Sequence, residues 1–107
     1  MKFEVTQNGA STTLKLKEKK LDSTIAPELK GEFLLICKPK VESLVVDLDE
    51  VEFCDSSGLS ALLIADRKMK DHGGKVKLIH VHKKVAGLLK ISMLDRVFDI
   101  HESAAKH

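Results

Sequence analysis

Residues 43–48, Ser-Leu-Val-Val-Asp-Leu, form a short apolar run that is rich in β-branched side chains. A continuous run of this kind is typical of a strand covered on both faces, as the strands of a parallel sheet are. A further strand is predicted over 75–81, and helix-like segments lie on either side of it. Because alternating strands and helices are joined by right-handed crossovers, we expect an α/β layer structure with a mainly parallel sheet.

The N-terminal part follows a different pattern, in which apolar and polar side chains alternate. This period of two predicts strands over 2–7 and 12–19, with Leu14 and Leu16 on the inner face of the second strand. The Asn8-Gly9 pair between them is a strong signal for a hairpin turn. An antiparallel hairpin with one solvated face is therefore expected at one side of the sheet.

Three helices are predicted from apolar side chains at three- and four-residue spacing. The first lies over 25–36, after capping side chains in the segment 22–24 and with Pro27 in its first turn. The second begins near Ser57 and ends at His72-Gly73-Gly74, and the third covers 84–92. A last short strand over 96–100 and a tail over 102–107 that begins like a helix complete the chain. The expected order is β-β-α-β-α-β-α-β in a single domain, residues 1–107, with the helices packed on the sheet.

The composition argues against several classes of protein. The 107 residues include 18 Lys and Arg against 16 Asp and Glu, and a formal net charge of +2 does not suit a strongly basic nucleic-acid binder. Trp and Tyr are absent, so no aromatic platform for stacking bases is expected. No apolar run is long enough to cross a bilayer, and the first residues lack the apolar core of a signal peptide. Cys37 and Cys54 are expected to be two unrelated buried thiols. Taken together, these features predict a cytoplasmic protein that binds neither nucleic acid nor membrane.

The segment 51–60 carries the chemistry of the chain, because it lies between a predicted strand and the N-terminus of a helix. Unpaired backbone N–H groups and the positive end of the helix dipole meet the hydroxyls of Ser56 and Ser57 there. One hydroxyl can cap the helix while the other faces solvent. Gly58 has no side chain, so a partner surface can approach closely.

Three functions are compatible with the motif Asp55-Ser56-Ser57-Gly58. The first is a plain capping loop. The second is a nucleophilic serine, although nothing in the sequence places any of the five histidines beside Ser56. The third is a phosphorylation switch, because a phosphate on Ser56 adds about −1.5 to −2 charges at a helix N-terminus that tolerates them.

The same residues resemble a known family. Val45-Val46-Asp47-Leu48 followed by Phe53-Cys54-Asp55-Ser56-Ser57-Gly58-Leu59 is similar to the signature of the STAS domain, found in sulphate transporter tails and bacterial anti-sigma factor antagonists. The resemblance extends across nearly the whole chain, from Leu21-Asp22 before the first helix to Gly73-Gly74 before a strand. Two positions depart from the pattern, because Lys19 and Met93 stand where the family often has glycine.

The resemblance implies a small STAS-like layer fold and a partner-switching protein of signal transduction and transcription regulation that is not an enzyme. In the antagonists the first serine of the motif, here Ser56, is the phosphoacceptor. The unphosphorylated form binds an anti-sigma factor that is itself a serine kinase, phosphorylation releases it, and a metal-dependent serine phosphatase resets it. The partner-binding residues expected from the resemblance are Asp22, Asp55, Ser57, Gly58 and Leu59.

The alternative is a STAS scaffold that is not phosphorylated, as a subunit of a transporter or a signalling assembly. No third ligand accompanies His80 and His82, so no metal site is predicted. No glycine-rich loop suited to cradling phosphates is present, and we expect no cofactor.

Overall fold

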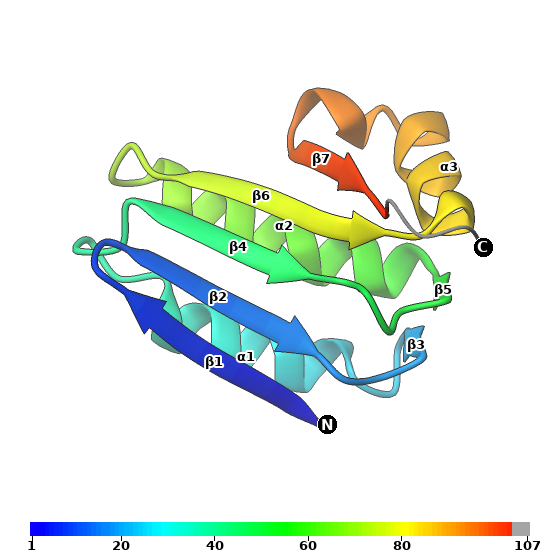
Figure 1. Cartoon of the computed structure of the whole chain (residues 1–107), viewed down its shortest axis with the longest axis horizontal. Helices are drawn as coiled ribbons and strands as arrows, with labels where there is room; N and C mark the ends of the chain where they lie inside the picture. Colours follow the sequence, from blue (N-terminus) through cyan, green and yellow to red (C-terminus); the bar gives the residue numbers. More distant parts are fainter. Residues whose placement is uncertain (104–107) are drawn as a thin grey trace.

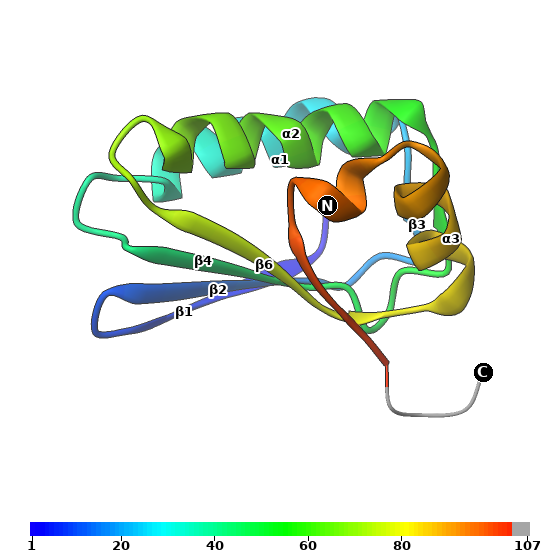
Figure 2. The same cartoon turned by 90° about the horizontal axis from the view of Figure 1, so that it is seen from above.

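The computed structural model describes residues 1–103 and shows a five-stranded sheet with two long helices on one face (Figures 1 and 2). The strand order is β1-β2-β4-β6-β7, in which the β1–β2 pair is antiparallel and the other pairs are parallel. This arrangement confirms the predicted mixed α/β fold with its N-terminal hairpin. The strands are β1 (Phe3–Asn8), β2 (Ser11–Leu16), β4 (Ser43–Asp47), β6 (Lys75–Val81) and β7 (Asp99–Glu102).

The helices α1 (Ala26–Ile36) and α2 (Ser56–Lys70) lie side by side over the sheet, as Figure 2 shows. A third helix, α3 (Lys83–Ile91), and the 3₁₀ turn η1 (Leu94–Arg96) pack near β7 at one edge. The main core fills the space between the two long helices and the sheet. Its fully buried side chains include Leu14, Leu16, Leu29, Phe33, Leu44, Val46, Leu62 and Leu78.

The opposite face of the sheet carries neither α1 nor α2 (Figure 2). Along β4, Leu44 and Val46 are fully buried beneath the helices, whereas Val45 and Asp47 are only partly buried. The prediction that this strand is covered on both faces is therefore wrong. The two crossovers that flank β4 place α1 and α2 on the same side of the sheet, and the apolar side chain of Val45 conceals the alternation in the sequence.

The C-terminal part differs from the prediction in its boundaries. The turn η1 occupies Leu94–Arg96 and β7 begins only at Asp99, so the strand lies later than the predicted 96–100. Glu102 belongs to β7, and residues 104–107 of the predicted helical tail lie outside the described residues. Met93 adopts a left-handed backbone with φ of 61°, the conformation that glycine reaches without strain.

A second, parallel sheet was not predicted and contains only β3 (Lys20–Leu21) and β5 (Phe53–Cys54). Strands of two residues are too short for any hydrophobic period to reveal them. Figure 1 shows this pair beyond the carboxyl ends of the main strands, at the point where the chain turns into α1 and α2. The small sheet therefore decides how the starts of the two long helices lie relative to each other.

Candidate functional site

The two aspartates of the predicted site are brought together by the small sheet. Leu21 of β3 pairs with Cys54 of β5, and the backbone N–H of Asp55 donates to the carbonyl of Leu21 at 3.2 Å. Asp22 and Asp55 each follow a member of this pair, so they occupy adjacent positions where the two chains leave the sheet. Residues more than thirty positions apart thus form one surface.

The start of α2 is capped by Asp55 rather than by a serine. One carboxylate oxygen of Asp55 accepts a hydrogen bond from the backbone N–H of Gly58 at 3.0 Å. This corrects the expectation that Ser56 or Ser57 caps the helix. Both hydroxyls are released from that task; Ser56 is exposed at the first position of α2, and Ser57 is partly buried.

Gly58 and Leu59 lie beneath the surface, although both were expected to contact a partner. A Cβ atom on Gly58 would lie 2.3 Å from the carbonyl oxygen of Leu21 and 2.9 Å from Sγ of Cys54. Leu59 is only 7% exposed and belongs to the core. The close approach that glycine allows here is made by β3 and β5 of the same chain, so these two residues hold the site in place.

Asp22 forms a turn of its own. One carboxylate oxygen accepts the backbone N–H of Thr24 at 3.0 Å and the hydroxyl of Thr24 at 2.5 Å. The hydrogen bond from the hydroxyl is the main cause that holds the pKa of Asp22 below its usual value. The segment 22–24 was expected to cap α1, but Ile25 occupies the N-cap position and makes no side-chain capping bond.

A groove of about 300 Å³ runs between the first turns of α1 and α2. Lys30 and Ser60 line it and were missed from the sequence, although Ser60 follows Ser56 by four residues and so shares its helix face. Lys30 could be found only by knowing that α1 lies beside α2. The complete lining is Ser23, Ala26, Pro27, Lys30, Ser56, Ser57 and Ser60.

The two cysteines are free and buried, as the sequence predicts. Burial raises the pKa of Cys54 to about 12 and that of Cys37 to about 11. At neutral pH both are therefore thiols and not thiolates. Although Cys54 precedes the motif directly, it does not offer a reactive nucleophile to the groove.

No histidine of the described residues lines the groove beside Ser56. The ring of His72 instead bonds the carbonyl of Val41 at 2.8 Å, and that of His80 meets the carboxylate of Asp47 at 3.0 Å. A serine hydroxyl without a neighbouring base has the nucleophilicity of an ordinary alcohol. Within residues 1–103, the lining of the groove therefore offers Ser56 no histidine as a general base.

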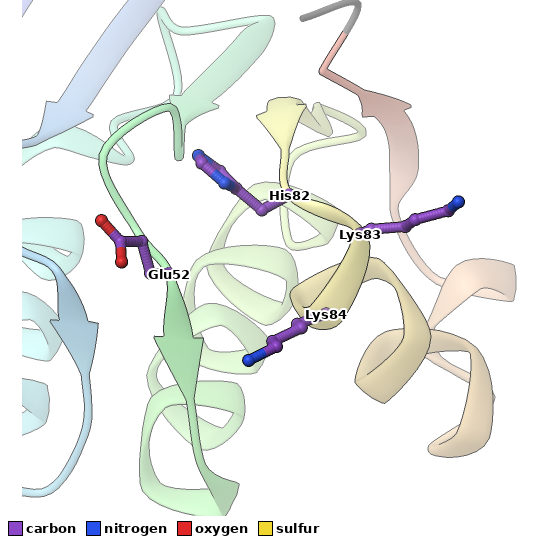
Figure 3. Close-up of a pocket in the computed structure, with 4 residues that line it drawn as sticks. All are labelled: Glu52, His82, Lys83 and Lys84. Carbon is purple, nitrogen blue, oxygen red and sulfur yellow. The ribbon is translucent and has the colours of Figure 1, made fainter. Parts of the chain in front are cut away.

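A second pocket, of about 460 Å³, is lined by Glu52, His82, Lys83 and Lys84. In Figure 3 the side chains of Glu52, His82 and Lys84 extend toward the same side of the view, and Lys83 is directed to the opposite side. A ring nitrogen of His82 bonds the carbonyl of Asp49, so this side chain links the loop after β4 to the start of α3. The pocket is larger than the groove, but its charged side chains do not converge on one point.

Across residues 1–103, the structure contains no group of three or more His, Cys, Asp or Glu side chains placed to hold a metal ion. Within the same part of the chain, no helix has the length and apolar character needed to span a membrane.

Comparison with solved structures finds the same fold in bacterial signalling and transport proteins. An anti-sigma-factor antagonist (STAS) domain protein from Planctomyces limnophilus has a TM-score of 0.83 at 22% identity, covering 94% of this chain and 89% of that chain. A Bacillus cell fate determinant in its phosphorylated form has a TM-score of 0.72 at 16% identity, covering 92% and 90%. A sulfate transporter family protein from Wolinella succinogenes has a TM-score of 0.74 at 15% identity, covering 89% and 79%.

These likenesses are below 25% identity and establish the fold. The family assignment comes from the sequence itself, because the family model of the STAS domain matches residues 2–107. The match includes the small sheet, both long helices and the groove between them. The chain therefore belongs to the STAS domain family.

Proposed function

We propose that this protein is a phospho-regulated anti-sigma factor antagonist, in which Ser56 is the phosphoacceptor. The observation that carries the proposal is the exposure of Ser56 at the first position of α2, where Asp55 already caps the helix and leaves the hydroxyl available. Unphosphorylated, the protein binds an anti-sigma factor that is itself a serine kinase. Phosphorylation releases it, and a metal-dependent serine phosphatase restores the binding form.

The chemical step uses the chain as a substrate. The Ser56 oxygen attacks the γ-phosphorus of ATP, an O–P bond forms, the bond to the β-phosphate oxygen breaks, and ADP leaves. The hydroxyl proton passes to a base of the kinase. The phosphatase returns the hydroxyl by hydrolysis and releases inorganic phosphate. In this proposal the protein is a binding module without catalytic activity of its own.

Charge provides the switch. Asp55 already places a carboxylate next to Ser56, and phosphorylation adds about −1.5 to −2 charges beside it. A kinase surface that fits the neutral hydroxyl then faces both repulsion and the cost of desolvating a dianion. A penalty of about 1.4 kcal/mol lowers affinity tenfold, so a few such interactions suffice to release the partner.

The test uses the cognate kinase and variants at both serines. Incubation with kinase and ATP should add one phosphate, read by intact mass, to the wild type and to Ser57→Ala but not to Ser56→Ala. By titration calorimetry, Ser56→Ala should bind the kinase like the wild type, and Ser56→Asp should bind at least roughly tenfold more weakly. Equal affinities of Ser56→Ala and Ser56→Asp would contradict the switch.

The alternative is a STAS scaffold that docks on a transporter or a larger assembly without being phosphorylated. The likeness to the sulfate transporter family protein favours it. The same mass measurement separates the two functions, because a scaffold acquires no phosphate from the neighbouring kinase. We place either function in the cytoplasm, since the two thiols are unpaired, as is usual in a reducing compartment. We also propose that residues 1–107 form a single domain.

A further inference from the structure

Lys30 is the one charged residue that the structure places on the lining of the groove next to Ser56. It lies in the second turn of α1, is partly buried, and makes no ion pair with any residue from 1 to 103. Every other polar side chain of the lining is a serine hydroxyl. A cation without a counter-ion therefore faces a groove of neutral groups.

We propose that Lys30 is the counter-charge that holds a phosphoryl group on Ser56 inside the groove between α1 and α2. The phosphate then folds back onto its own chain and occupies the groove. This inference rests on the proposed function only for the origin of the phosphate, and it assigns a role to a residue outside the Asp-Ser-Ser-Gly motif.

The groove supplies donors as well as charge. The backbone N–H groups of Ser56 and Ser57, at the start of α2, have no acceptor among the described residues, because Asp55 takes only the N–H of Gly58. The hydroxyl of Ser60 lies on the same helix face, one turn further along. A lysine on a flexible stem can approach a phosphate from the α1 side while these groups approach it from the α2 side.

The carboxylate beside Ser56 favours such a counter-charge. Asp55 is adjacent to Ser56 in the chain and disfavours a nearby dianion, and the helix dipole offsets only part of this effect. Asp22 lines a separate pocket with four lysines, so neither its carboxylate nor these lysines line the groove at Ser56. The four are Lys2, Lys17, Lys19 and Lys20.

The experiment installs phosphoserine at position 56 during translation, which makes it independent of any kinase. The second pKa of the phosphate is followed by ³¹P NMR in otherwise unchanged protein, in Lys30→Met, in Lys30→Arg and in Lys38→Met. Lys38→Met is the matched control, because it removes the same charge at a position beyond the C-terminal end of α1. Lys30→Met should raise that pKa by about 0.5 unit, whereas Lys30→Arg and Lys38→Met should leave it close to the starting value.

An equal pKa in Lys30→Met and in the unchanged protein would overturn the role of Lys30. So would an equal rise in Lys38→Met, since the effect would then be general and not local. The fate of the proposed function is read separately: failure of a cognate kinase to modify Ser56 refutes the switch but leaves the ³¹P result intact. Conversely, if Lys30→Met leaves the second pKa of the phosphate unchanged, the role of Lys30 is refuted even when a kinase modifies Ser56 and is then released.

Discussion

The two long helices begin at neighbouring places, yet their first turns are built differently. Each follows a two-residue strand and an aspartate, Asp22 before α1 and Asp55 before α2. The carboxylate of Asp55 caps its helix, whereas that of Asp22 bonds Thr24 within the preceding turn and leaves the N-cap of α1 to Ile25. The start of α2 therefore has a side-chain cap, which the start of α1 lacks.

Because of this difference, the residues on the α1 side of the site can vary more freely than those on the α2 side. Around α2, Asp55 and Gly58 are tied to the small sheet and to the helix backbone. Around α1, Ser23 and Lys30 line the groove and contribute little to the core. The α2 side holds Ser56 in position, and the α1 side supplies the charge and shape opposite it.

The largest expected difference between the two helices is in how the unfolding free energy responds to replacing a glycine in each of them. Gly58→Ala should destabilise the protein by about 3 kcal/mol, because the added Cβ meets the carbonyl of Leu21 at 2.3 Å. Gly31→Ala in α1 should instead stabilise it by about 0.5–1 kcal/mol, since nothing lies within 4 Å of its Cβ. Urea unfolding measures both, and a Gly58→Ala variant as stable as the wild type would show that the close contact with Leu21 does not fix the start of α2.

The capping aspartate gives a smaller effect. Asp55→Ala should cost about 1 kcal/mol of unfolding free energy, because the N–H of Gly58 loses its acceptor. Asp55→Asn should retain most of the stability, since an amide oxygen can accept the same bond. Asp22→Ala is the matched control on the α1 side and should cost less, as it caps no helix. Equal losses at the two aspartates would show that the two starts are equivalent.

The smallest effect concerns the titration of Asp22. Its pKa is lowered in the folded state, chiefly by the hydroxyl of Thr24, so the ionised carboxylate favours folding above the unfolded pKa. That contribution is lost as the pH falls through the lowered pKa. NMR titration of the carboxyl group should give a higher pKa for Asp22 in Thr24→Val than in the wild type. An identical pKa in both proteins would show that the hydroxyl of Thr24 does not lower the pKa of Asp22.

Long, periodic segments were predictable from the sequence, and short or spatial features were not. The hairpin, α2 and β6 follow directly from their side-chain periods and turn residues, as does the inner position of Leu14. The motif around Ser56 was found because its residues are consecutive. The β3–β5 pair and Lys30 were missed, because the first is too short to show a period and the second meets the motif only through packing.

The small β3–β5 sheet also bears on how such proteins diversify. It anchors the turn that carries Ser56 through backbone hydrogen bonds and the buried Gly58. None of these contacts depends on the identity of a bound partner. Residues at the exposed rim of the groove can therefore change in the course of evolution while the fold of this turn is preserved.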